Sequence, residues 1–525
     1  MSDIRDLVPA DAVETGEIGF SIPERYNAAR ILFDNLEAGR GDKVAVLTET
    51  EQVTYAELCR RACRIGNGLL ALGCQRGDRV LLVLDDSPDY AAAIFGALRA
   101  GLVPILINTL SPADLIAYFL EDSAAKAALL HSGHRNLFPE KTDAALIELD
   151  SADGKSWVAG QGDDLAEADT NRNDMAFWMY SSGSTGRPKG VVHLHHDMAY
   201  TVESYAKRVL GIREDDVCFS VPKIFFAYGF GNSITFPFAM GATTAFLPDR
   251  PVPERIFDVI RSCRPTLLFA LPTVYTALIK SPAAEGADLS SVRLCISAAE
   301  VLSGDVFNAW KNRFGHEIIE GLGSTEVLHI YLSNTVEKKR LGSAGMRVPG
   351  YSVRLTDRDG KDVGPGEEGI MWVRGDSNAP FYWNRPDKTE ETMRDGWIWT
   401  GDRFTMDDDG FYFFKGRADD LIKVSGQWVY PLEVELCLNE HPKVLECAVM
   451  GLAMDDGRMT LAAVIAPMPG TDGGDVLGEE LKAYVKTELL PYKYPRQILY
   501  MDKLPKTGTD KIDRQACKKL LMQGT

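Results

Sequence analysis

Residues 180–190 read YSSGSTGRPKG, a loop with the composition of a clamp for an anion. Small residues let backbone N–H groups approach phosphate oxygens, hydroxyls add donors, and Arg187 and Lys189 add positive charge. The run MAFWMY at 175–180 predicts a strand that leads directly into this loop. Pro188 stands where a Walker A loop requires its second glycine, and this loop does not have the G-x-G-x-x-G pattern either. The plain alternative to an anion clamp is a mobile surface linker.

The length and composition indicate a multidomain globular protein. The chain has 525 residues, 45% of them hydrophobic and 25% charged. A single core seldom uses more than ~250–300 residues, so we expect at least two domains. The net charge of -18 argues against nucleic acid or an anionic membrane as the main partner. We therefore expect small-molecule partners for a protein that is a monomer or a homodimer.

Cysteine usage and the apolar stretches favour the cytoplasm. Nine cysteines without zinc-type spacing are typical of reduced thiols. The N-terminal residues 1–30 lack a basic start followed by an apolar run, so no signal peptide is expected. The apolar stretch 90–108 is interrupted by Arg99 and Pro104, which indicates a helix followed by a strand rather than a membrane helix.

Up to about residue 350 the sequence alternates between strand and helix patterns. A capping box at Thr54 and Glu57 predicts a helix that Gly73 ends, and Pro88 opens another helix. This alternation favours parallel sheets covered by helices. Apolar runs predict strands at 80–85, 103–108, 217–221, 243–247, 266–270 and 293–297.

The pattern changes after about residue 350. Apolar and polar residues alternate around DG and GPG turns, which is typical of antiparallel hairpins, up to residue 417. Residues 418–525 mix helical and strand patterns over the length of an ordinary domain of ~100–150 residues. The sequence thus predicts a separate small α+β domain at the C-terminal end.

Several segments together resemble the adenylate-forming superfamily, which includes acyl- and aryl-CoA synthetases, peptide-synthetase adenylation domains and luciferases. The resemblance runs over nearly the whole chain from about residue 25. It implies an α/β fold with a large N-terminal adenylation domain (1–416) of parallel helix-covered sheets and a small β-barrel-like subdomain, a hinge (417–420), and a small mobile α+β domain (421–525). The segments that carry it are YSSGSTGRPKG, GLGSTE at 321–326, TGD at 400–402, GRADDLIKVSGQWVYP at 416–431 and LPKTGTDKIDR at 504–514.

The resemblance implies a reaction in two steps. An organic carboxylate attacks the α-phosphate of ATP, giving an acyl-adenylate and pyrophosphate, and the thiol of coenzyme A then expels AMP. Lys511 resembles the lysine that bridges the two anions in the first step. Asp419 resembles the hinge, and Lys423 and Gly426 resemble residues that serve thioester formation and line the pantetheine tunnel. Lys423 as an ordinary strand-edge lysine is the alternative, and Asp510 departs from the glycine usual before the catalytic lysine.

The resemblance assigns the nucleotide site residue by residue. Glu326 resembles the acid that binds Mg²⁺, with Thr185 able to add a hydroxyl, and Asp402 and Arg417 resemble ribose ligands. The alanine pair 298–299 stands where many relatives have glycine. The phosphates are expected at Ser181, Ser182, Gly183, Ser184, Thr185, Gly186 and Lys189, and the rest of the nucleotide beside Ala299, Glu300, Glu320, Gly321, Leu322, Gly323, Ser324 and Thr325.

Two further segments, KIFFAYGFGNS at 223–233 and STEVLHIYLSN at 324–334, resemble benzoate-CoA ligases and their aryl relatives. A flat neutral ring requires apolar and aromatic walls, which agrees with these segments. FFAYGF could equally be a core strand or aromatic cluster, and His329 could be a packed neutral histidine. The residues expected to face the acid are Ala227, Tyr228, Gly323, His329 and Ile330.

Benzoate or a substituted benzoate is therefore the predicted acid, activated by an AMP-forming acid–CoA ligase. Three alternatives stay open: the same chemistry on a cyclic aliphatic or short-chain acid, the loading of a phosphopantetheine carrier, and a non-catalytic relative. The run HLHH at 193–196 raises the question of zinc, but no Cys or acidic partner stands at matching spacing.

Overall fold

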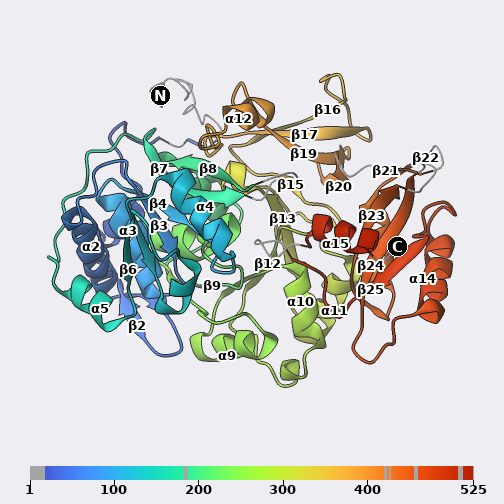
Figure 1. Cartoon of the computed structure of the whole chain (residues 1–525), viewed down its shortest axis with the longest axis horizontal. Coiled ribbons are helices and arrows are strands. Elements are labelled where there is room, and N and C mark those ends of the chain that lie inside the picture. Colours follow the sequence, from blue (N-terminus) through green and yellow to red (C-terminus); the bar gives the residue numbers. More distant parts are fainter. Residues whose placement is uncertain are drawn as a thin grey trace. The chain divides into compact units, whose positions relative to one another are not determined.

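The structure of the chain is a computed structural model. It describes residues 18–19, 21–181, 187–418, 422–424, 427–453, 459–506 and 512–523, without the side chains of Lys423 and Trp428. The chain divides into two units, one formed by residues 1–353 and 372–399 and the other by residues 354–371 and 400–525. Figure 1 shows the elements along the chain, coloured from blue at the N-terminus to red at the C-terminus.

A six-stranded sheet leads into the loop at 180–190. It consists of β3 (Arg79–Val83), β4 (Val103–Leu106), β5 (Ala127–Leu130), β6 (Ala145–Glu148), β7 (Met175–Ser181) and β8 (Lys189–Leu194). The spatial order is β6-β5-β3-β4-β7-β8, and every neighbouring pair is parallel except β7 with β8. The predicted strands at 80–85, 103–108 and 175–180 are confirmed.

A nine-stranded sheet carries the second set of predicted strands. It consists of β1 (Val44–Leu47), β2 (Gln52–Thr54), β9 (Val217–Ser220), β10 (Thr243–Ala245), β11 (Leu267–Ala270), β12 (Leu294–Ser297), β13 (Ile318–Gly323), β14 (Ile330–Ser333) and β15 (Met346–Arg347). The strands from β1 through β10, β9, β11 and β12 to β13 pair in parallel. At one end β2 pairs antiparallel with β1. At the other end β14 pairs antiparallel with β13, and β15 pairs antiparallel with β14.

Helices cover these sheets, as Figure 1 shows for α2 (Tyr55–Ala71) and α3 (Pro88–Arg99). The hydroxyl of Thr54 accepts from the Glu57 backbone N–H at 3.3 Å, which confirms the predicted cap. Gly96 lets the two helices approach, because a Cβ there would lie 2.4 Å from the Ala62 carbonyl oxygen. The other helices before residue 350 are α1 (Arg30–Glu37), α4 (Ala113–Ser123), α5 (Ala152–Ala159), α6 (His195–Thr201), α7 (Ala227–Phe230), α8 (Phe236–Ala239), α9 (Pro253–Cys263), α10 (Pro272–Lys280) and α11 (Gly304–Phe314).

Short helical turns connect several of these elements. Two of them, η3 (Val202–Lys207) and η4 (Gly231–Thr235), are π-helical, and π-helical turns are rare and frequent at functional sites. The remaining turns are η2 (Ser132–Leu137), η5 (Pro282–Ala284) and η6 (Thr325–Val327).

Between residues 350 and 417, one sheet consists of β16 (Ser352–Thr356), β17 (Glu368–Arg374), β18 (Met393–Arg394), β19 (Trp397–Met406) and β20 (Tyr412–Arg417), with the helix α12 (Pro386–Thr392) before β18. In this sheet β18 and β20 both pair antiparallel with β19, as the alternating pattern predicts. The α+β prediction for residues 418–525 is also confirmed. Those residues form β21 (Ile422–Val424), β22 (Gln427–Val429), β23 (Val444–Ala453), β24 (Met459–Pro467), β25 (Gln497–Tyr500), α13 (Pro431–Glu440), α14 (Asp475–Glu488) and α15 (Arg514–Gln523).

The C-terminal elements have a core of their own. Aliphatic side chains from β23 and β24 pack against α13 and α14, with Val434, Leu438, Leu461, Ile465 and Leu481 all buried. Such a core agrees with the predicted separate domain. The boundary at 417–420 stays a prediction, since the two units divide the chain at other positions.

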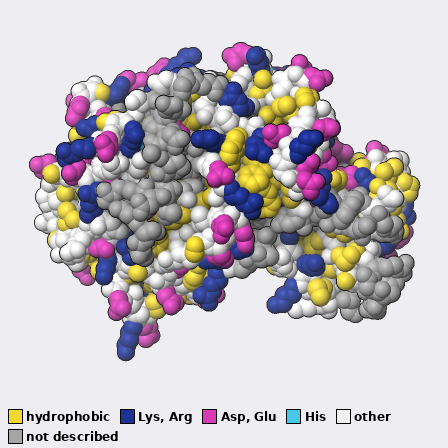
Figure 2. All heavy atoms as spheres, turned by 90° about the horizontal axis from the view of Figure 1, so that it is seen from above, with side chains coloured by type: hydrophobic (Ala, Val, Ile, Leu, Met, Phe, Trp, Pro, Cys, Tyr) yellow, Lys and Arg dark blue, Asp and Glu magenta, His cyan; other side chains and the backbone are white. Residues whose placement is uncertain are grey.

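Acidic and basic side chains are interspersed on the face of the molecule in Figure 2, so the net charge of -18 is not gathered there into one block. All nine cysteines lie within the described ranges, where each is a buried free thiol. No helix in the described part of the chain combines the length and the apolar character that a membrane span requires.

Candidate functional site

The two strands that flank the predicted phosphate loop hold its ends together. Ser181 is the last residue of β7 and Lys189 the first of β8, and the two are paired across the strands. The predicted phosphate ligands between them, Ser182, Gly183, Ser184, Thr185 and Gly186, lie outside the described residues. The geometry therefore fixes where the loop starts and ends.

Glu326, the predicted cation-binding acid, lies beside these loop ends. Its Oε1 accepts from the Tyr382 hydroxyl at 2.8 Å, and the Ser181 hydroxyl lies 3.5 Å from the same oxygen. The Lys189 ammonium lies 4.1 Å from the centre of the Tyr382 ring. Burial lowers the pKa of Lys189, and the charge of Glu326 opposes that change. The structure thus brings three predicted residues together and adds Tyr382, which sequence reasoning missed.

The donor set around Glu326 fits a hard cation. Mg²⁺ takes oxygen ligands and shares its coordination with nucleotide phosphates, so one carboxylate from the protein is sufficient. The Glu326 side chain is half-buried, and the two contacts from described residues both reach Oε1. Thr185, the second predicted ligand, lies outside the described residues.

The backbone around Glu326 is held at three successive carbonyl oxygens. The Thr325 oxygen accepts from His193 Nε2 at 2.8 Å, and the Glu326 oxygen accepts from the Ala379 N–H at 2.7 Å. The Val327 oxygen accepts from the Ser377 hydroxyl at 2.8 Å. Sequence reasoning missed all three donors. The only signal was the run HLHH, and within the described ranges no cluster of His, Cys, Asp or Glu side chains has metal-holding geometry.

The strand β13 carries the residues predicted beside the nucleotide. Gly323 is its last residue, and a Cβ there would lie 2.5 Å from the His329 carbonyl oxygen, so the close return of the chain requires glycine. The Glu320 carboxyl is buried and accepts from the Leu302 N–H at 3.0 Å. Burial raises the pKa of Glu320 to about 8. Ala299 has a φ of 71°, a left-handed conformation that glycine adopts without strain.

The predicted acid wall begins with α7 rather than with a strand, so a core strand at FFAYGF is wrong. Ala227 and Tyr228 are half-buried, whereas His329 and Ile330 are buried. His329 packs among aromatic rings, with the Phe236 ring centre at 4.5 Å and the Tyr228 ring centre at 5.6 Å. The half-buried side chains of Tyr228 and Ala227 give this wall its apolar character.

His329 itself is a packed neutral histidine. Burial lowers the pKa of its imidazole to about 3. Its Nε2 donates to the Tyr228 carbonyl oxygen at 3.3 Å. A neutral imidazole has one donor and one acceptor, so Nδ1 is the acceptor. Direct contact of this ring with the acid stays a prediction.

The predicted ribose pair is brought together by strand pairing in the second unit. Asp402 in β19 is directly opposite Arg417 in β20, and the Arg417 Nη1 lies 3.2 Å from Asp402 Oδ1. Of the remaining predicted residues, Lys423 lies in β21, where its side chain is not described. Asp419, Gly426 and Lys511 lie outside the described residues.

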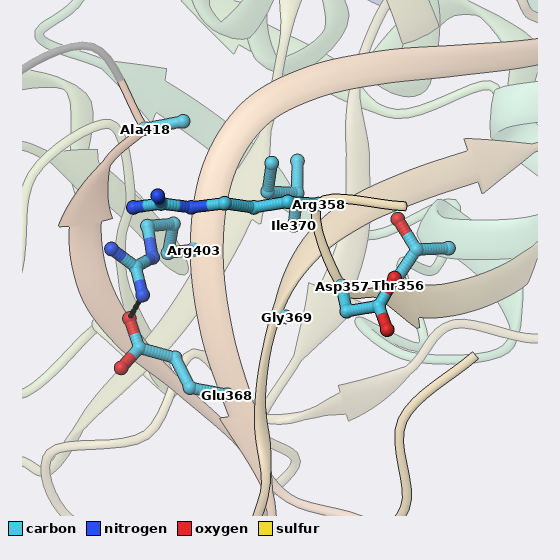
Figure 3. Close-up of a pocket in the computed structure, with 8 residues that line it drawn as sticks. All are labelled: Thr356, Asp357, Arg358, Glu368, Gly369, Ile370, Arg403 and Ala418. Atoms are coloured by element: carbon cyan, nitrogen blue, oxygen red, sulfur yellow. Dashed lines mark ion pairs between the residues drawn. The ribbon is translucent and has the colours of Figure 1, made fainter. Parts of the chain in front are cut away.

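A cavity of about 150 Å³ lies in the second unit beside this pair. Figure 3 shows the Arg403 guanidinium pointing at Glu368, with which it makes an ion pair at 2.6 Å. The Tyr430 hydroxyl contacts the two Glu368 oxygens at 3.1 and 3.2 Å. Two guanidinium and two carboxylate groups line the cavity, so its formal charges balance and do not favour an anion. The full lining is Thr356, Asp357, Arg358, Glu368, Gly369, Ile370, Arg403 and Ala418.

Comparison with known families agrees with this architecture. Residues 33–383 match the AMP-binding enzymes, and residues 433–511 match the AMP-binding enzyme C-terminal domain. The chain belongs to the family of AMP-binding enzymes.

Several similar proteins match almost the whole chain. The benzoate–CoA ligase of Thauera aromatica is 43% identical, over 94% of this chain and 96% of that protein. The crystal structure of a benzoate CoA ligase from Burkholderia xenovorans LB400 is similar with a TM-score of 0.87 and 38% identity, over 94% of this chain and 100% of that one. The crystal structure of the anthranilate CoA ligase AuaEII in complex with anthranoyl-AMP is similar with a TM-score of 0.89 and 35% identity, over 96% of this chain and 98% of that one. The predicted fold of an adenylate-forming enzyme is thereby confirmed.

Proposed function

We propose that this chain is an ATP-dependent, AMP-forming ligase that joins an aromatic acid, benzoate or a substituted benzoate, to coenzyme A. One observation supports it above the others. A single stretch, residues 323–330, carries the carboxylate of Glu326 on one side and the buried ring of His329 on the other. It therefore combines a group that holds a charged nucleotide complex with an apolar wall suited to a flat ring.

In the first step, an oxygen of the acid attacks the α-phosphorus of ATP and the bond to the bridging oxygen of pyrophosphate breaks. Two anions must approach, so positive charge is needed near both. Mg²⁺, when bound by Glu326 and Thr185, supplies charge at the phosphates. Ser181 and Lys189 hold the two ends of the phosphate loop, and Lys511 bridges the acid and the nucleotide.

In the second step, the sulfur of coenzyme A attacks the acyl carbon, the thiol proton leaves, and AMP departs with the pair of electrons of the broken acyl–oxygen bond. We assign this step to the face of the C-terminal domain that carries Lys423 and Gly426, presented after rotation about Asp419. Asp402 and Arg417 hold the ribose in both steps, since a carboxylate accepts from two sugar hydroxyls. The protein is proposed to work in the cytoplasm, where its buried thiols remain reduced.

The test is a panel of aryl and alkyl acids assayed for release of AMP from ATP, with and without coenzyme A. Benzoate or a substituted benzoate is expected to give the highest kcat/KM and a CoA thioester. A preference for cyclic aliphatic or short-chain acids would change the acid and keep the chemistry. Adenylate without thioester would favour the loading of a carrier protein. Protein that consumes no ATP with any acid would refute the proposal.

A further inference from the structure

The run HLHH at 193–196 contains three histidines with different bonding. His195 Nδ1 accepts from the Ala28 N–H at 3.0 Å, and burial lowers the pKa of His195 to about 3, so this ring is a neutral acceptor. His196 instead faces two carbonyl oxygens, that of Arg172 at 2.9 Å and that of Asp376 at 2.7 Å. Its Nε2 also lies 3.2 Å from Asp197 Oδ1.

His193 has the most consequential pair of partners. Its Nε2 lies 2.8 Å from the Thr325 carbonyl oxygen, and its Nδ1 lies 2.7 Å from Asp197 Oδ2. Because the carbonyl oxygen only accepts, Nε2 carries a proton, and a further proton joins Nδ1 to the carboxylate. The side chains of His193 and Asp197 are both 0% exposed.

The orientation of the His193 ring is fixed from several sides. Asp197 Oδ2 also accepts from the Leu194 N–H at 3.0 Å, which holds the carboxylate at the start of α6. The His193 ring stacks on Phe177, with the ring centres 5.4 Å apart and the planes at 25°. A ring held by a carboxylate and by stacking directs its remaining N–H in one direction only.

The N–H points at the carbonyl oxygen of Thr325, the residue before Glu326. A change in the position of the Thr325 carbonyl would rotate the peptide that leads into Glu326 and would move its carboxylate. Ala379 and Ser377 hold the next two carbonyl oxygens, at 2.7 and 2.8 Å, so the turn η6 is fixed along its length. His193 supplies the first of these three contacts from an element that lies 132 residues earlier in the sequence.

We propose that His193, oriented by Asp197, is a positioning residue for Glu326: its Nε2–H on the Thr325 carbonyl oxygen sets where the cation-binding carboxylate lies. The assignment rests on the proposed function, in which Glu326 holds the cation of the nucleotide complex. It goes beyond that function because it gives the run HLHH a role in nucleotide binding.

A purely stabilising role accounts poorly for this arrangement. A buried polar pair of this kind contributes little to stability compared with apolar side chains of the same volume, because both groups lose their water. A pair that fixes the direction of one hydrogen bond has a different use, since partners that orient a metal ligand change metal affinity by ~10–100-fold when they are removed.

Two variants separate the contacts of His193. In His193→Asn the short amide can replace Nδ1 toward Asp197 but cannot reach the Thr325 oxygen. In His193→Gln the longer amide can reach that oxygen. His134, whose Nε2 lies 3.0 Å from Asp85 Oδ1, gives the control variant His134→Gln, because this contact lies outside the turn η6.

The measurement is calorimetric binding of a non-cleavable ATP analogue to the full chain, with Mg²⁺ and with EDTA. We expect His193→Asn to weaken binding of the Mg²⁺ complex by ~10-fold or more and to change binding of the metal-free analogue by less than ~2-fold. His193→Gln is expected to recover most of the loss, and His134→Gln is expected to match the wild type. Mn²⁺ affinity in the presence of the analogue, measured by electron paramagnetic resonance, should follow the same order.

Equal binding of the Mg²⁺ complex by His193→Asn and the wild type would overturn the positioning role and leave the proposed function intact. Equal losses with and without the metal, or no recovery in His193→Gln, would also overturn it. If His193→Asn does not fold, Ser377→Ala tests the same turn, and an unchanged Mg²⁺ dependence there counts against the proposal. A wild type that binds no nucleotide would refute the proposed function itself.

Discussion

The turn around Glu326 lies three residues before His329, whose ring packs against the wall around Tyr228, yet turn and wall are built in different ways. Three successive carbonyl oxygens of the turn each accept a hydrogen bond, one from His193 and two from the segment of Ser377 and Ala379. The wall runs from α7 through the π-helical η4 to α8. Among the described residues there, the hydroxyls of Ser233 and Thr235 and the Nδ1 of His329 are buried without a hydrogen-bond partner.

The difference follows from what each region must do. A carboxylate that holds a cation has to lie in one place, because an error of ~1 Å weakens an interaction that depends on geometry. A wall for a flat neutral ring needs shape and apolar surface, so it tolerates an irregular helix and unsatisfied polar atoms. Each unsatisfied buried polar atom costs about 1–3 kcal/mol, and the turn has one as well, the hydroxyl of Ser324, whereas the wall has several.

The largest effect is expected in the turn, at Glu326. Glu326→Gln keeps the size of the side chain and an oxygen for the Tyr382 hydroxyl but removes the charge. We expect ATP–pyrophosphate exchange with benzoate to fall by ~10²–10³-fold, the loss usual for one group that stabilises a developing charge. Tyr382→Phe, which removes one contact to Oε1, should lose far less. Equal exchange rates in Glu326→Gln and the wild type would show that this turn does not serve the nucleotide.

Gly231→Ala tests the wall. A Cβ at Gly231 would lie 2.2 Å from Cδ2 and 2.4 Å from Nε2 of His329, so the imidazole must move. We expect a loss of about 1–3 kcal/mol in the free energy of unfolding, the usual effect of overpacking. The KM for benzoate should rise by more than the KM for ATP.

Gly133→Ala is the matched control for that variant, because a Cβ at Gly133 meets nothing within 4 Å. Urea unfolding and steady-state kinetics measure both quantities. If Gly231→Ala raises the two KM values by the same factor, the wall and the turn are not separate in function.

The effect expected at Glu320 is smaller and depends on pH. Its carboxyl is buried and accepts one backbone hydrogen bond, from Leu302. Burial raises its pKa from 4.5 to about 8, so between these values the folded chain holds a proton that the unfolded chain has lost. Its contribution to stability is complete below pH 4.5 and decreases by ~1.4 kcal/mol per pH unit as the pH rises toward 8. Glu320→Gln should remove this decrease, so the variant gains on the wild type with rising pH. Parallel stability–pH curves from urea unfolding would contradict the assignment.

The smallest expected effect is at Ala299. Its φ of 71° lies in the left-handed region, where a residue with a Cβ is strained by about 1–2 kcal/mol. Ala299→Gly relieves that strain. Glycine also makes the unfolded chain more flexible, which offsets part of the benefit, so we expect a net gain of about 0.5–1 kcal/mol in the free energy of unfolding. Thermal and urea unfolding check it. A loss of stability would mean that the methyl group of Ala299 packs more favourably than its backbone strains.

Local patterns in the sequence determined much of the fold. Thr54 and Glu57 predict a helix start because both groups lie within one turn, and the apolar runs predict strands because four or five successive buried side chains suffice. The resemblance placed Asp402 and Arg417 at the ribose, and the pairing of β19 with β20 brings these residues, 15 apart, opposite each other. The family motifs placed Glu326 and the loop at 180–190 for the same reason: each motif is a continuous string.

Only the tertiary structure decided which residues surround those sequence motifs. The donor to the Thr325 oxygen comes from His193, 132 residues away, and the donor to Glu326 Oε1 comes from Tyr382, 56 residues away. The sequence shows that HLHH places three imidazoles close together, which raises the question of zinc. It does not show which carbonyl oxygens other segments bring to those rings. Hydrogen-bond partners are set by the packing of distant elements, and side-chain spacing along one segment carries no information about them.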